Sequence, residues 1–160
     1  MTIDLSLVLA RVLPQAIAWV KATAALGFAA GRPLAAAGVE LAGFVGVGRA
    51  EDVRVCVVGE MPGLPTGELA TIATQLDFLG PGTQGLALDS TIFVREGCFS
   101  YRLLAHELRH VHQFEAAGSI DAYIPQYLAQ IARFGYRDAP FEVDARTFED
   151  VREGAATLLR

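Results

Sequence analysis

Apolar residues recur every three or four positions from Leu5 to Ala24, and this spacing predicts a helix. Pro14 should kink or split that helix because proline removes a backbone hydrogen bond. Arg32-Pro33 then interrupts the helical pattern, and a second apolar helix is expected over Leu34–Val45. The first third of the chain is therefore predicted to form two mostly apolar helices.

The hydrophobic period changes after Gly48. Val53–Val58 is rich in β-branched residues and predicts a strand. Residues 59–67 contain two prolines and should form a loop, followed by a short helix over Glu68–Phe78. Two more β-prone runs, 85–88 and 91–94, flank a two-residue polar break, which predicts a hairpin.

Helical periodicity returns after the hairpin. Ser100 is a suitable N-cap for a helix over Tyr101–Ala117, and Gly118 is a suitable stop. A further helix should end near Gly135, with Pro125 in its first turn.

A last helix is expected after an N-cap at Asp138. Its apolar face would consist of Phe141, Ala145, Phe148, Val151 and Ala155. The order of elements is helices, then a small sheet, then three helices, which is typical of an α+β domain.

The length of 160 residues fits one domain. We divide it into an apolar helical segment, residues 1–48, and a remainder, residues 49–160. The net charge is -5 and the basic residues form no cluster, so we set nucleic-acid binding aside because it needs a basic patch. Cys56 and Cys98 are expected to be reduced thiols, with a single disulfide as the alternative.

The N-terminal segment carries no clear targeting signal. Asp4 stands where a signal peptide has positive charge, so a cytoplasmic location is expected. Charged residues interrupt the apolar stretch 16–42 before it reaches the roughly 20 residues of a membrane span. A buried or amphipathic helix is the preferred interpretation over peripheral membrane association. Such helices could pack on the rest of the domain, on a second copy as a homo-oligomer, or on lipid.

The chemistry is concentrated in His106-Glu107-Leu108-Arg109-His110. Residues four apart lie on one face of a helix, one turn above the other, so both imidazoles can bind one metal ion. Imidazole nitrogens together with a carboxylate favour Zn2+. Glu107 leans over the same face and can contact a water at the metal without being a ligand.

A catalytic zinc site needs a third protein ligand and an open position. His112 is two residues from His110 and should point away. Glu142 and Asp144 are the other candidates, and they lie about 200° apart around a helix, so only one can face the metal well.

The HExxH helix followed by a P-F-E-x-D-A element resembles the gluzincin branch of the zincin metallopeptidases, especially small bacterial single-domain members. It is more distantly similar to CAAX-prenyl-protease-like peptidases. The resemblance covers roughly Val53–Glu149 and implies Glu142 as third ligand, with Ala145 at the matching place of an E-x-x-A element. It also implies a zincin-like core over residues 49–160, with a small mixed sheet packed on the HExxH helix. Arg109 departs from the many relatives that carry a smaller residue there.

The resemblance further implies a zinc peptidase that acts on peptide or protein substrates, with Glu107 as general base. Thr91–Val94 would be the edge strand that binds substrate. Tyr136, His112 and Tyr123 could donate to the oxyanion, and Asp144 could hydrogen-bond the second nitrogen of a ligand.

Two other functions compete with this interpretation. One is a non-catalytic metal-binding or interaction module, against which the intact Glu107 argues. The other is a membrane-surface or assembly protein with a structural zinc, which a fourth protein ligand such as His112 would favour.

Overall fold

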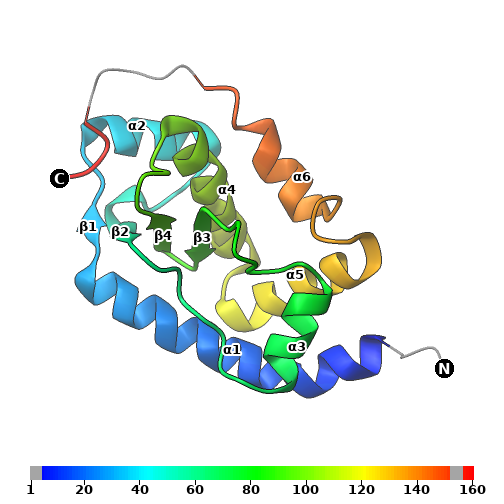
Figure 1. The fold of residues 1–160 in the computed structure, drawn as a ribbon. Helices are drawn as coiled ribbons and strands as arrows, with labels where there is room; N and C mark the ends of the chain where they lie inside the picture. The colour runs from blue at the N-terminus through cyan, green and yellow to red at the C-terminus, as the bar shows by residue number, and fades with distance from the viewer. Residues whose placement is uncertain (1–4, 152–156) are drawn as a thin grey trace.

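The computed structural model describes residues 5–151 and 157–160. These residues form an α+β fold of six α-helices and a four-stranded mixed sheet (Figure 1). The helices are α1 (Leu5–Ala30), α2 (Ala36–Val45), α3 (Glu68–Gln75), α4 (Tyr101–Ala117), α5 (Ile120–Phe134) and α6 (Pro140–Thr147). The strands are β1 (Arg32–Pro33), β2 (Arg54–Val58), β3 (Gly85–Leu88) and β4 (Thr91–Arg95), and a short 3-10 helix, η1, spans Ala50–Asp52.

The strand order is β1-β2-β4-β3, with β2 and β4 parallel and the other pairs antiparallel. The predicted hairpin of β3 and β4 is confirmed. The expectation that Thr91–Val94 forms the edge strand is wrong. That run is β4, which pairs with β2 on one side and with β3 on the other, so β3 is the strand at the edge.

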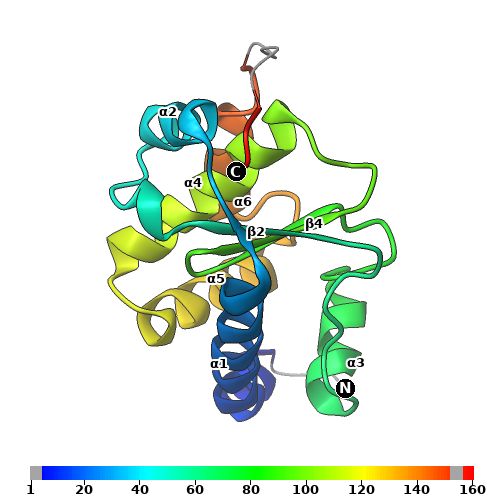
Figure 2. The same cartoon turned by 90° about the vertical axis from the view of Figure 1, so that its left-hand side faces the viewer.

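The sheet is covered on both faces. Side chains alternate along its strands, so Val55 and Ile92 join one core cluster with α2 and α4, whereas Cys56 and Phe93 join a second cluster with α1 and α5. Figure 2 shows the sheet between α2 and α4 above and α1 below. Burial on both faces explains why residues 92–94 in the middle of β4 are all apolar.

The N-terminal helix packs directly on this sheet. A Cβ atom at Gly27 would lie 2.4 Å from the Phe93 ring, so glycine permits the close approach. Pro14 does not split α1. Its missing N–H would have bonded the carbonyl of Ala10, and both residues are exposed, so water can solvate that carbonyl. The helix also has the length and apolar composition of a membrane span, and 28% of its most apolar window is buried. Core helices of soluble proteins and signal sequences have the same length and composition.

The predicted ends of α4 are confirmed. The Ser100 hydroxyl accepts a hydrogen bond from the Leu103 N–H, and Gly118 adopts the left-handed conformation after the last turn. This capping makes the HExxH motif part of one uninterrupted helix. In α5, however, Pro125 lies in the second turn instead of the first, because Ser119 caps the helix earlier than expected.

The last helix differs from its prediction at both ends. Ala139, not Asp138, precedes its first residue, and no side chain caps it. The helix ends at Thr147, so Phe148 and Val151 follow it and do not continue its face. Ala155 lies outside the described residues. Cys56 and Cys98 are free thiols, the first buried and the second half-buried.

Candidate metal centre

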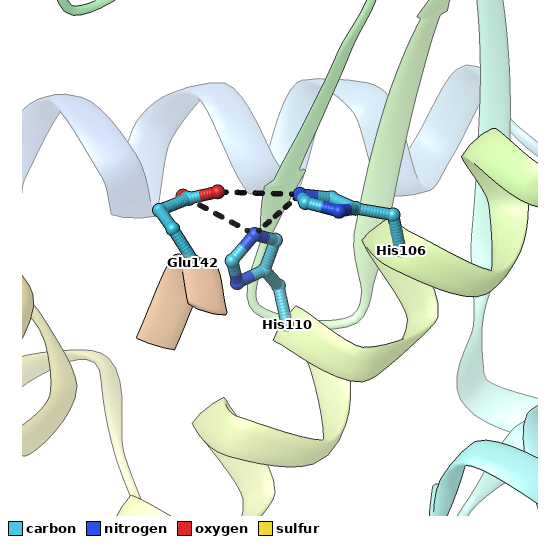
Figure 3. Close-up of side chains that lie close together, drawn as sticks. All are labelled: His106, His110 and Glu142. Carbon is cyan, nitrogen blue, oxygen red and sulfur yellow. Dashed lines mark hydrogen bonds and ion pairs between the residues drawn. The ribbon is translucent and has the colours of Figure 1, made fainter. Parts of the chain in front are cut away.

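Three side chains from two helices converge on one point, which we call the metal point. His106 and His110 come from consecutive turns of α4, and Glu142 comes from the first turn of α6 (Figure 3). The two Nε2 atoms are 3.1 Å apart. One Glu142 oxygen lies 3.3 Å from Nε2 of His106, and the other lies 3.3 Å from Nε2 of His110. The structure therefore brings together the three residues expected to be ligands.

These separations are of the size found between ligands of one metal ion. Two ligands bound at about 2.0–2.1 Å in tetrahedral geometry lie about 3.3–3.4 Å from each other. The two Nε2 atoms are 3.1 Å apart, and each has a different oxygen of Glu142 at 3.3 Å. The group of His106, His110 and Glu142 could hold a metal ion.

The imidazole of His106 is oriented by a carboxylate on its far side. Its Nδ1 lies 2.8 Å from Oε1 of Glu149. Because a carboxylate only accepts, Nδ1 carries the proton, and Nε2 presents its lone pair to the metal point when the ring is neutral. Arg102 in turn pairs with Glu149 at 2.6 Å, which fixes the carboxylate. Glu149 was not among the residues singled out by sequence.

The imidazole of His110 is oriented by an amide. Its Nδ1 lies 2.8 Å from Oε1 of Gln113, and the Gln113 amide nitrogen donates to Oδ2 of Asp144 at 2.8 Å. The amide oxygen accepts from Nδ1–H, so Nε2 again faces the metal point. Asp144 thus acts on His110 only through Gln113, which corrects the expectation of a direct bond to a ligand nitrogen.

Glu142, the third candidate ligand, is almost completely buried, and only 1% of the residue is exposed. Tyr127 donates its hydroxyl proton to Oε1 of Glu142 at 2.8 Å. Burial by itself would raise the pKa of Glu142, but hydrogen bonds from both histidines and the charge of His110 outweigh it and hold that pKa well below its usual range. Glu142 is therefore ionised at neutral pH and ready to bind a cation.

Protons compensate the buried charge when no metal is bound. Burial by itself would lower the pKa of His110, but the hydrogen bond to Glu142 and the charges of Glu142 and Glu107 outweigh it and raise that pKa to about 9. The pKa of His106 is also raised, mainly by its hydrogen bond to Glu142 acting against burial. A metal ion must therefore displace protons from this group.

Glu107 is held against the edge strand. Its carboxylate hydrogen-bonds the backbone of Ala87, and the whole residue is only 5% exposed. Gly85 makes this position available, because a Cβ atom there would lie 2.4 Å from Oε1 of Glu107. Burial raises the pKa of Glu107, and the charges of His110 and His106 oppose that rise. A carboxylate with a raised pKa beside a metal point is suited to accept and return a proton near neutral pH.

The other candidates lie apart from this group. Asp144 forms a two-point ion pair with Arg109, at 2.8 and 3.2 Å, and does not contact the histidines. This pairing also explains Arg109, which faces Asp144 and the carbonyl of Val45 instead of the metal point. His112 bonds the carbonyl of Gly46.

The two tyrosines expected to be possible oxyanion donors, Tyr136 and Tyr123, both line the cavity beside the candidate ligands. Tyr136 lines the same cavity as Glu107 and His110 and is 39% exposed. Burial, together with the charges of Glu142 and Glu107, raises its pKa. Its hydroxyl therefore keeps its proton at neutral pH. Tyr123 donates to Oε1 of Gln113 at 3.2 Å, so it supports His110 indirectly.

Comparison with known proteins gave no match to a family model, to a curated protein or to a solved structure.

Proposed function

We propose that this protein is a zinc-dependent peptidase with a zincin-like core. The observation that carries the proposal is the convergence of His106, His110 and Glu142 at metal-ligand spacing, with Glu107 buried beside them. Two imidazole donors and one carboxylate favour zinc over calcium or magnesium, which prefer oxygen ligands in larger number. Peptides or proteins would be the substrates.

The ligand count supports a catalytic site over a structural one. Structural zinc usually has four protein ligands, whereas catalytic zinc has three and an open position. Among residues 5–151 and 157–160, the only described group of this kind has three members, and His112 bonds Gly46 instead of joining it. This arrangement disfavours the alternative of a purely structural metal.

The roles of the residues follow from their contacts. Zinc, when bound, supplies Lewis acidity that activates water near neutral pH and polarises the scissile carbonyl. Glu107 accepts the proton of the attacking water and returns it to the leaving amine. Glu149 and Gln113 accept the Nδ1 protons of the two histidines, so that Nε2 of each ring faces inward as the ligating nitrogen once the ring is neutral. Tyr127 fixes the third ligand.

Metal content and hydrolysis test this proposal together. The purified protein should bind close to one zinc ion per chain and cleave members of a quenched fluorescent peptide library. Glu107→Gln should keep the metal and lose hydrolysis, because the amide cannot accept the proton. Glu142→Ala should weaken zinc binding at least tenfold.

An exposed acid on a different helix provides the matched control. Glu40 lies on the exposed side of α2, and Glu40→Gln should retain both zinc and activity. Loss of zinc in Glu107→Gln would show that this residue is a ligand and that its assigned role is wrong. Unchanged zinc affinity in Glu142→Ala would remove the proposed metal site itself.

A further inference from the structure

An apolar cavity of about 70 Å³ adjoins the metal point, and the N-terminal helix forms part of its wall. We propose that this cavity binds one leucine- or phenylalanine-sized side chain of the peptide substrate, beside the bond to be cleaved. The proposal rests on the peptidase function proposed above and gives α1, which lies outside the zincin resemblance, a direct role in substrate selection.

The walls of the cavity come from several helices and one strand. Val12, Ala16 and Trp19 of α1 line one side, and Ile72 and Ala73 of α3 line another. Strand β3 and helices α4 and α5 complete the lining. Figure 2 shows α3 beside α1, on the side of the sheet away from α2.

Helix α3 and the loop before it are held against α1 by two side-chain contacts. The indole N–H of Trp19 donates to the carbonyl of Gly63 at 3.0 Å, in the loop before α3. Arg11 pairs with Glu68, the first residue of α3, at 2.6 Å. These bonds hold α3 in place as a wall of the cavity, so the shape of the cavity depends on the N-terminal segment.

The lining changes character along the cavity. At the metal end it contains Gly85, Glu107, His110, Tyr136 and Glu142, and every other lining residue is apolar or aromatic. Against the apolar walls, a charged or strongly polar substrate side chain would lose its hydration without gaining a partner, which disfavours its binding. An apolar side chain is stabilised by the same burial. The chemistry of the walls therefore selects an apolar occupant.

Size narrows the choice further. A cavity of about 70 Å³ accommodates roughly five water-sized groups. This matches a branched aliphatic side chain, or an aromatic ring after small side-chain adjustments, and it is too small for a long acyl chain. The polar end next to the general base places the backbone of such a residue at the reacting groups, which is the usual layout of a specificity pocket.

Trp19 provides a direct reporter, because it is the only tryptophan and lines the cavity. The metal-free protein should be titrated with N-acetyl-leucinamide and, as the matched probe without a side chain, N-acetyl-glycinamide. We expect a saturable change in Trp19 fluorescence with the leucine probe and none with the glycine probe.

Cavity-filling variants make the assignment specific. Ala16→Leu fills the cavity from α1 and should weaken binding of the leucine probe at least tenfold. Ala18→Leu adds the same side chain at an exposed position of the same helix and should leave binding unchanged. Ala73→Leu fills the cavity from α3 and should reproduce the effect if Ala16→Leu does not fold.

The outcomes separate this inference from the proposed function. Equal responses to both probes, or undiminished binding in two folded filling variants, would overturn the pocket assignment. Tighter binding of decanoate than of N-acetyl-leucinamide would assign the cavity to acyl chains and also overturn it. The titration needs no zinc, so a failure of hydrolysis leaves its result intact. Hydrolysis without preference for leucine over glycine beside the cleaved bond would refute the pocket while leaving the peptidase standing.

Discussion

Gly85→Ala tests how closely the edge strand and the general base are fitted together. The new Cβ atom would lie 2.4 Å from Oε1 of Glu107 and 2.9 Å from its Cδ, whereas ordinary contact begins near 3.4 Å. The carboxylate must therefore move by about 1 Å, and it has little room because it is buried and bonded to Ala87. A misplacement of about 1 Å can cost on the order of 10²-fold in rate. This corresponds to about 2.7 kcal/mol in transition-state stabilisation.

The assay compares kcat/KM on a fluorogenic peptide with zinc content in the same preparation. We expect Gly85→Ala to lose about 10²-fold in kcat/KM while it binds a full equivalent of zinc, because the three atoms nearest to the new methyl group all belong to Glu107, which is not a proposed ligand. Gly43→Ala is the control, since nothing lies within 4 Å of a Cβ atom at Gly43. Thermal unfolding should be recorded for both, so that activity is measured on folded protein. Wild-type kcat/KM in Gly85→Ala would refute the placement of Glu107 as general base.

Three further predictions concern the support of the metal point and the core. Glu149→Gln should weaken zinc affinity by about 10–100-fold, measured by competition with a chelating dye, because His106 loses its ionised partner. The metal-free protein, kept in chelator, should lose up to about 3 kcal/mol of unfolding free energy in urea as pH rises from about 6.5 to about 9. This sign follows because folding raises the pKa of His110 from its ordinary value to about 9. The protonated ring therefore contributes fully to stability below the pKa that His110 has in the unfolded chain, and this contribution is lost above the pKa that it has in the folded protein. Leu104→Ala should cost 2–5 kcal/mol in the same urea experiment, because this side chain is fully buried between α4 and the sheet.

Each of these predictions has a result that would contradict it. An unchanged zinc affinity in Glu149→Gln would mean that His106 is oriented by other contacts, and Glu40→Gln at the surface serves as its control. Stability that rises between pH 6.5 and 9 would show that His110 is neutral in the folded metal-free protein. A loss below 1 kcal/mol in Leu104→Ala would mean that the core cluster on this face of the sheet is not packed as described.

Local pattern was enough to locate most elements. The predicted helix over Tyr101–Ala117 has those bounds in the structure, because its cap at Ser100 and its stop at Gly118 are short-range hydrogen-bond devices. The hairpin was equally local, with two residues between its strands. The failures also have local causes. Ser119 caps α5 with its hydroxyl, whereas the prediction placed the start of this helix from the position of Pro125.

Second-sphere contacts were harder to predict from sequence. Glu149 is seven residues after Glu142, or about two helical turns, and this spacing is the one local signal that could have identified it. Because α6 ends at Thr147, Glu149 reaches His106 from the residues that follow the helix. The Tyr127 hydroxyl, on α5, bonds a carboxylate on another helix, and no local spacing indicates this contact.

Helical periodicity alone places His106 and His110 on one helix face, because residues four apart always share a face of an α-helix. The choice of Glu142 over Asp144 as their partner comes from the packing of α6 against α4. The tertiary structure also decided that β3 is the edge strand beside Glu107 and that α1 lines the adjoining cavity. Such placements depend on contacts between residues far apart in the chain, which periodicity and capping do not encode.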